Sequence, residues 1–197
     1  MKTLIAIPAF DRMCTITAQC LMNIQLVGAV GTKFIIGMQV DHARNLLAKY
    51  AIEHGFDRIL WLDSDMTFSP DIMERLSADL DDGWDIVSGL YFKRTYPTEP
   101  VIYKEITTEP SAETYRDYPK EKVFRIAGCG FGGVMMKTEI LADMKEPPFN
   151  ELNGMSEDLS FCYRMKDKHI ACDSRVKLGH IGISIYGEQL YEHPNGG

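Results

Sequence analysis

Short apolar runs alternate with segments of helical spacing along the first 88 residues. The runs at 4–7, 33–38, 59–62 and 85–88 predict strands, and the segments at 15–27, 41–55 and 70–80 predict amphipathic helices. Strands that alternate with crossover helices form a doubly wound α/β sheet whose ligands bind at the carboxyl ends of the strands. The run at 59–62 is entirely apolar, as in a parallel strand buried on both faces.

The second half of the chain is less regular. Prolines and charges gather between 93 and 122, and we interpret 107–119 as a surface excursion. Short strands are predicted at 101–103, 122–126, 133–136, 170–172 and 176–178, with helices at 138–144 and 157–166. With no repeat and no convincing linker, we expect a single domain over residues 1–197.

The composition limits the classes of protein to which the chain can belong. The formal net charge of −7 argues against a general coat for nucleic acid. Five cysteines, an odd number without a CxxC pair, favour free thiols in a reducing compartment. The opening apolar run is too short for a signal peptide, and no run approaches the roughly 18 apolar residues of a membrane span. These features predict a cytoplasmic protein.

The acidic pair in Asp63-Ser64-Asp65 directly follows the apolar run at 59–62. Two carboxylates at the end of a buried strand are electrostatically unfavourable unless a cation lies beside them. Hard oxygen ligands suit Mg²⁺ or Mn²⁺, which keep coordination positions open for phosphate oxygens. The alternative is an acidic turn that leads into the next helix. The apolar strand and the sheet context favour the metal site.

A second polar group opens the helix that precedes this strand. Asp41 suits the helix cap, and Arg44 lies in the first turn, where a helix N-terminus and an arginine together favour a diphosphate. The structural alternative is that Arg44 pairs with a surface acid.

A third group, Ser156-Glu157-Asp158, begins the helix predicted at 157–166. Ser156 suits the cap, and acids in a first helical turn are stabilised by the helix dipole. Alternatively, one carboxylate acts as general base toward an acceptor hydroxyl while the other orients it.

Two further features have both a structural and a functional interpretation. His180, between two glycines after a short strand, is either structural or a metal ligand. The glycine-rich segment 128–133 favours a loop that lets a substrate approach closely, and the structural alternative is a tight turn between two strands. A dinucleotide fingerprint is excluded there because the residues that follow predict a strand rather than a helix.

Taken in order, these segments resemble a GT-A-fold glycosyltransferase, and they are similar to glycosyltransferase family two with its small phage-like and bacterial members. The resemblance runs from residue 3 to about 183. The opening strand with its nucleotide-binding loop corresponds to Ile5-Ala6-Ile7-Pro8-Ala9-Phe10, and the helix start with arginine corresponds to Ala43-Arg44-Asn45. The DxD motif corresponds to Leu62-Asp63-Ser64-Asp65, and the ED motif with its following arginine corresponds to Glu157-Asp158 with Arg164.

The resemblance implies a Rossmann-like, mixed but mainly parallel central sheet flanked by helices. It implies a nucleotide-sugar-binding half at about 1–92, an acceptor-binding and catalytic half at about 93–185, and a tail at 186–197. Asp65 and His180, with Asp63 beside them, would form the metal site, and Asp63 would face ribose or the donor sugar. Asp158, next to Glu157, would be the base of an inverting enzyme and would only orient substrate in a retaining one. The implied nucleotide contacts are Pro8, Ala9, Phe10, Arg12, Asp41, Arg44, Asp63, Ser64 and Asp65.

The chain also departs from the family. Residues 36–39 contain no acid, although the family's second strand commonly ends in an acid that contacts the base. Little sequence follows His180, so the acceptor site is expected to be open or to be completed by another subunit of a homo-oligomer.

We therefore predict a glycosyltransferase that depends on Mn²⁺ or Mg²⁺ and moves a hexose from a UDP- or GDP-linked donor to a hydroxyl of a glycan, lipid or small molecule, with inversion. The alternatives are a nucleotidyltransferase, whose glycine-rich basic signature after the first strand is missing at 8–15, and a non-catalytic module that binds nucleotide or glycan.

Overall fold

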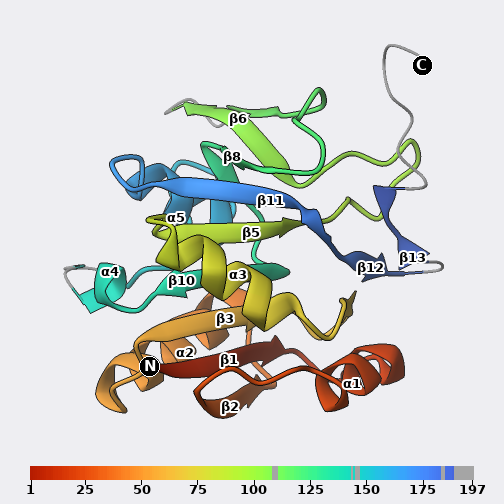
Figure 1. Ribbon diagram of the computed structural model, residues 1–197. Helices are drawn as coiled ribbons and strands as arrows, with labels where there is room; N and C mark the ends of the chain where they lie inside the picture. The colour runs from red at the N-terminus through yellow and green to blue at the C-terminus, as the bar shows by residue number, and fades with distance from the viewer. Residues whose placement is uncertain (108–110, 143, 145–146, 183–184, 189–197) are drawn as a thin grey trace.

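The computed structural model describes residues 1–107, 111–142, 144, 147–182 and 185–188. Its main sheet has seven strands in the order β2-β1-β3-β10-β5-β11-β8, which run from bottom to top in Figure 1. In chain order these strands are β1 (Lys2–Ala9), β2 (Ala29–Ile36), β3 (Arg58–Leu62), β5 (Ile86–Leu90), β8 (Val123–Arg125), β10 (Gly133–Lys137) and β11 (Ile170–Lys177).

Two small sheets of three strands each extend the described part of the fold. One has the order β13-β12-β4 and the other β7-β6-β9. Their strands are β4 (Met66–Thr67), β6 (Ile102–Thr107), β7 (Ser111–Thr114), β9 (Gly128–Cys129), β12 (Gly179–Ile181) and β13 (Ile185–Tyr186). The predicted excursion at 107–119 therefore contains strand β7, which pairs with β6. Residues 108–110 and most of the predicted tail, from 189 onward, lie outside the described residues.

The prediction of a mainly parallel sheet is wrong. In the main sheet β1 pairs in parallel with β2 and with β3, and β5 with β11, whereas β10 is antiparallel to both of its neighbours and β8 to β11. All pairings in the two small sheets are antiparallel. The reason lies in β10, which lies between β3 and β5 and runs opposite to both, so it interrupts the parallel order in the middle of the sheet.

Helices cover both faces of the main sheet. Helix α3 (Ile72–Asp81) lies in front of the sheet in Figure 1, and α2 (Val40–Glu53) and α5 (Glu157–Arg164) lie behind it. Strand β3 is covered on both sides, because all its residues are buried and successive side chains point to opposite faces of the sheet, where two different hydrophobic cores lie. Trp61 packs in the core that contains α2 residues, and Leu60 packs in the core that contains α3 residues. The prediction of a strand buried on both faces is confirmed.

Several element boundaries differ from the prediction. Helix α1 (Thr15–Met22) ends early, and the amide of Gln25 then donates to the carbonyl of Pro70 at 2.8 Å, which draws the chain out of helical geometry. The predicted helix at 138–144 is the single turn α4 (Glu139–Ala142). The two short strands predicted at 170–178 are one strand, β11, with an irregular register between Asp173 and Lys177.

The glycine-rich segment connects β9 to β10, and its glycines make room for the protein's own side chains. A Cβ on Gly130 would lie 2.0 Å from the Tyr91 hydroxyl oxygen, and one on Gly133 would lie 2.3 Å from a methyl of Leu178. Tyr91 is buried, and its hydroxyl accepts a hydrogen bond from the amide of Gly132 at 3.3 Å. Close packing of Tyr91 accounts for Gly130, and close packing of Leu178 accounts for Gly133. The segment turns between two strands, as the structural alternative predicted.

We expect Gly130→Ala to destabilise the fold by about 1–3 kcal/mol, because the added methyl overpacks a filled core. Chemical denaturation monitored by tryptophan fluorescence measures this loss. In the Tyr91→Phe background the clash with the hydroxyl is gone, so the same substitution should cost less. Equal costs in both backgrounds would contradict the assignment of the clash to Tyr91.

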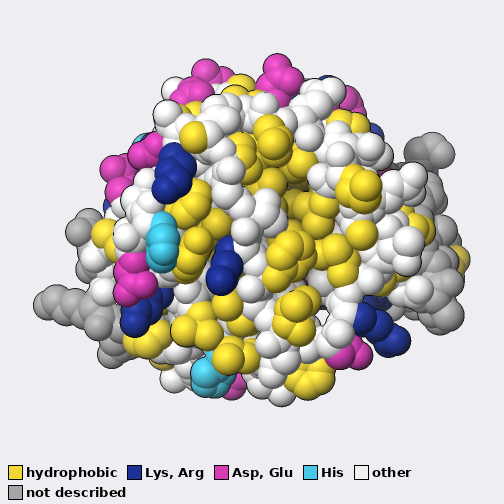
Figure 2. Space-filling model, turned by 90° about the horizontal axis from the view of Figure 1, so that it is seen from below, with side chains coloured by type: hydrophobic (Ala, Val, Ile, Leu, Met, Phe, Trp, Pro, Cys, Tyr) yellow, Lys and Arg dark blue, Asp and Glu magenta, His cyan; other side chains and the backbone are white. Residues whose placement is uncertain are grey.

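Strand β2 forms one edge of the main sheet and carries exposed apolar side chains, among them Phe34 and Ile36. Figure 2 looks at this side of the molecule and shows apolar side chains spread over it. The predicted association into a homo-oligomer stays a prediction.

All five cysteines are free thiols, as predicted. Within the described residues, no helix combines the length and the apolar character needed to cross a bilayer.

Candidate functional site

The DxD segment leaves the carboxyl end of β3 and lines a pocket of about 360 Å³. The end of β1 and the segment that leads into α2 form its other walls, so the pocket lies where ligands bind in doubly wound sheets. Of the residues predicted to contact nucleotide, six line it, together with Met38, Gln39, Val40 and Arg94; the six are Pro8, Ala9, Phe10, Asp63, Ser64 and Asp65.

Beside this pocket, hydrogen bonds from Arg44 connect the residue that follows β3 to the first residue of α5. Its side chain is only 3% exposed, and it donates one hydrogen bond to Asp63 at 3.0 Å and another to Glu157. The guanidinium carbon also lies 5.4 Å from the centre of the Phe131 ring. Burial alone would lower the pKa of Arg44, but Asp63 and Glu157 raise it above its ordinary value, so the side chain stays cationic. The paired acids are functional-site candidates rather than surface acids.

The acids of α5 have two different environments. Burial raises the pKa of Glu157 above its usual value, against the effect of Arg44, and the neighbouring Asp158 adds to the increase. Ser156 is the N-cap residue, as predicted, and its hydroxyl bonds to Oδ1 of Asp158 rather than to the backbone. Oδ1 of Asp158 also accepts from the amide of Leu159 at 2.8 Å. Among the described residues no partner bonds Oδ2 of Asp158, which leaves that oxygen available to a substrate hydroxyl.

His180 reaches Asp65 because β12 pairs antiparallel with β4, which places His180 opposite Met66. The distance between Nε2 of His180 and Oδ2 of Asp65 is 3.6 Å, and the same carboxylate oxygen accepts a hydrogen bond from Arg94 at 2.8 Å. The ring nitrogen Nδ1 of His180 lies 3.2 Å from the carbonyl oxygen of Phe92, which orients the imidazole. Burial acts to raise the pKa of Asp65, but His180 and Arg94 together hold it below its usual value.

The predicted metal ligands Asp63, Asp65 and His180 fit a divalent cation only in part. The part of the chain that the structure describes holds no group of three His, Cys, Asp or Glu side chains that could bind a metal ion. Asp63 is bonded to Arg44 instead. Asp65 and His180 remain as a carboxylate and an imidazole close enough to share one cation. Such a pair fits Mn²⁺ or Mg²⁺ only where substrate phosphates and water supply the other ligands.

Two predicted contacts lie away from the pocket. Arg12 is 86% exposed and pairs only weakly with its neighbour Asp11, at 3.9 Å. Asp41 is not the cap of α2, because the N-cap residue is Gln39, and Asp41 bonds the imidazole of His42 at 3.1 Å.

Three residues of the site were not identified from the sequence. Gln39 and Arg94 line the pocket, and the buried Tyr91 packs edge-on against His180 with ring centres 5.7 Å apart. Tyr91 follows β5 directly. The rule that ligands gather at the carboxyl ends of parallel strands could have found it, since β5 is parallel to β11.

The chain has a GT-A-like fold. No protein-family model and no curated protein matches the sequence, so membership of family two stays a prediction.

Many solved structures are similar to this chain, and two of them are A197 from STIV and GalNAc-T7. A197 from STIV matches with a TM-score of 0.72 and 20% identity, over 92% of this chain and 86% of that one. GalNAc-T7, a GT-A glycosyltransferase solved with UDP, GalNAc and Mn²⁺, matches with a TM-score of 0.65 and 11% identity. That match covers 98% of this chain and 45% of GalNAc-T7. At these identities the likeness concerns the fold alone.

Proposed function

We propose that this protein is a glycosyltransferase that moves a sugar from a UDP- or GDP-linked donor to a hydroxyl acceptor. The observation that carries the proposal is the buried Arg44, which holds Asp63 of the DxD segment and Glu157 of α5 at one edge of the sheet. A donor in the pocket beside them would lie between the DxD segment and Asp158. GalNAc-T7, a transferase with a similar fold, was solved with UDP, a sugar and Mn²⁺, which supports the choice of donor.

In this proposal Asp65 and His180 hold Mn²⁺ or Mg²⁺, whose positive charge stabilises the diphosphate leaving group. Asp63 contacts ribose or the donor sugar through the carboxylate oxygen that Arg44 does not bond. Arg94 lies at the pocket and can move its hydrogen bonds from Asp65 to a phosphate. The exposed Phe10 and the amide of Gln39 lie on the pocket wall, where they can contact the base in place of the missing acid.

Asp158 is the base of the proposed reaction. The acceptor hydroxyl gives its proton to Asp158, and its oxygen forms a bond to the anomeric carbon. The bond from that carbon to the diphosphate oxygen breaks, which inverts the configuration. Glu157 does not serve as base here, because Arg44 bonds its carboxylate. Its role is to position the start of α5 against α2.

Isothermal titration with UDP and GDP, with and without Mn²⁺, tests the metal site. We expect one nucleotide to bind more tightly with Mn²⁺, and Asp65→Ala to weaken that metal-dependent binding by about tenfold or more. Asp167→Ala removes an exposed acid outside the pocket and should bind like the wild type. Equal metal-dependent binding by wild type and Asp65→Ala would remove Asp65 from the metal site. Release of pyrophosphate from a sugar nucleotide would instead indicate a nucleotidyltransferase.

A further inference from the structure

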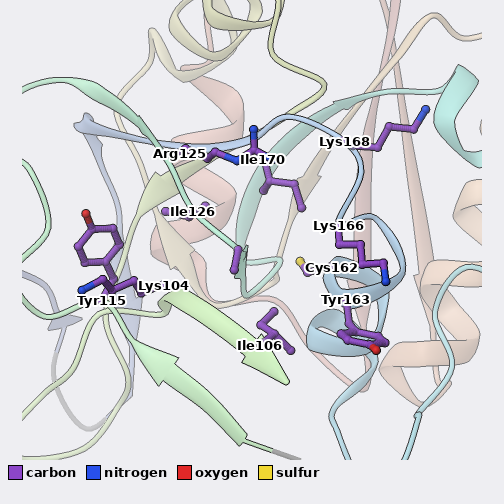
Figure 3. A pocket seen from close by; sticks show the side chains of 11 residues that line it. Lys104, Ile106, Tyr115, Arg125, Ile126, Cys162, Tyr163, Lys166, Lys168 and Ile170 are labelled. Atoms are coloured by element: carbon purple, nitrogen blue, oxygen red, sulfur yellow. The ribbon is translucent and has the colours of Figure 1, made fainter. Parts of the chain in front are cut away.

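A second pocket, of about 360 Å³, lies at the other end of α5 from Glu157. Figure 3 shows its lining side chains, which come from β6, from the residue after β7, from β8 and the residues after it, from the end of α5 and the residues after it, and from the start of β11. Helix α5 has eight residues, so its two ends are about 12 Å apart at 1.5 Å per residue. No residue lines both this pocket and the one at the DxD segment.

The charge of this pocket is opposite to that of the whole chain. Of the residues that the structure describes, four cationic side chains and no aspartate or glutamate line it, although the chain has a net charge of −7. They are Lys104, Arg125, Lys166 and Lys168. Like charges that gather around one cavity repel each other, so this arrangement is unfavourable without an anion.

Among the described residues, none forms an ion pair or hydrogen bond with any of these four side chains. Two of them lie over aromatic rings instead. The Lys104 amine lies 5.8 Å from the centre of the Tyr115 ring, and the Lys166 amine lies 5.7 Å from that of Tyr163. Both rings are part of the pocket wall. The cations are therefore available to a ligand.

The dipole of α5 explains only part of this charge. Cations are favoured near the carboxyl end of a helix, and Lys166 and Lys168 follow α5. Lys104 and Arg125, however, lie on β6 and β8, which belong to different sheets. A helix terminus gives no reason for cations on these strands to face the same cavity.

The pocket also has an apolar interior. Ile106 lies near its centre in Figure 3 and is only half-buried, whereas Ile126 and Cys162 beside it are buried; the side chain of Arg125 extends toward Ile170. Tyr115 and Tyr163 lie on opposite sides of it. An ion alone would leave this apolar surface uncovered, whereas a small organic molecule with an anionic group would fill the centre and reach the cations at the rim.

We propose that this pocket binds a small organic phosphate, with its phosphate held by the rim cations and its body on the apolar centre. A phosphate group suits the site better than a carboxylate, because it carries more charge and more acceptor oxygens, and several cations can share it. A soluble metabolite and a lipid headgroup both present this phosphate group, and the binding test distinguishes them. The proposal does not depend on the function proposed for the DxD pocket.

Equilibrium binding in buffer freed of divalent cations by a chelating resin tests the proposal. The probes are glycerol 3-phosphate, inorganic pyrophosphate, and phosphatidylcholine vesicles with or without phosphatidic acid. The pocket variant is Arg125→Gln with Lys166→Gln. The matched control is Arg12→Gln with Lys49→Gln, which removes two exposed cations elsewhere. Circular dichroism verifies that both variants fold.

We expect at least one phosphate probe to bind, the pocket variant to bind it about tenfold or more weakly, and the control to retain it. Asp65→Ala should also retain it, because that residue lies in the other pocket. Binding of soluble probes would identify a soluble phosphate, and binding only to vesicles with phosphatidic acid would identify a lipid headgroup. The proposal is overturned if the wild type binds none of the probes, or if wild type and pocket variant bind equally.

Discussion

Arg44→Met is expected to lower the free energy of unfolding by about 3 kcal/mol, because removal of one partner leaves buried carboxylates uncompensated. Arg44 is buried and bonds both Asp63 and Glu157, and each of these has a partly buried side chain. Methionine keeps much of the apolar volume of arginine, so the decrease in the free energy of unfolding comes mainly from the lost positive charge. Urea denaturation with global fitting of wild type and variant measures it.

Two further variants identify the cause of that loss. Arg12→Met removes an arginine that is 86% exposed and should leave stability unchanged. Adding Glu157→Gln to Arg44→Met should restore part of the stability, because it neutralises one of the acids left without a partner. A loss below about 1 kcal/mol for Arg44→Met would show that solvent reaches these acids and that the pair is not a buried one.

Asp158→Asn is expected to lower kcat for sugar transfer or donor hydrolysis by about 10²–10⁴-fold, which is the usual contribution of a general base. Asparagine keeps an oxygen that can accept from the amide of Leu159, so the start of α5 should be preserved. Donor binding, measured by titration, should change little.

The comparison with Asp167→Asn separates catalysis from net charge. Asp167 is exposed and follows the same helix, so its loss should leave kcat unchanged. An unchanged kcat for Asp158→Asn would exclude Asp158 as the base. A loss of kcat accompanied by unfolding of α5 would assign Asp158 to the helix cap.

Much of the site could be predicted because its signals are local. The strand before Asp63 is recognisable from its apolar run, and the start of α5 from a serine followed by acids. Asp41 was misassigned because capping depends on where the backbone turns into the helix, and Gln39 holds that position. The sequence pattern at 41–44 does not distinguish a cap from a first-turn residue.

The glycine-rich segment shows a different limit. Its composition indicates close approach, but a sequence does not say what approaches. In the structure the neighbours of these glycines include Tyr91 and Leu178, which come from other strands and loops. Arg94 was not predicted as a site residue, because its hydrogen bond to Asp65 connects two segments that are distant in the sequence.

The sequence by itself determined the α/β class, the strand that precedes Asp63-Ser64-Asp65 and the helix start at Glu157, because apolar periodicity and capping depend on residues within a few positions of each other. Only the tertiary structure decided the antiparallel place of β10, the pairing of β12 with β4 that brings His180 to Asp65, and the burial of Arg44 between two acids. These pairings are set by how distant segments share buried surface and satisfy each other's charges, and no local pattern encodes that choice.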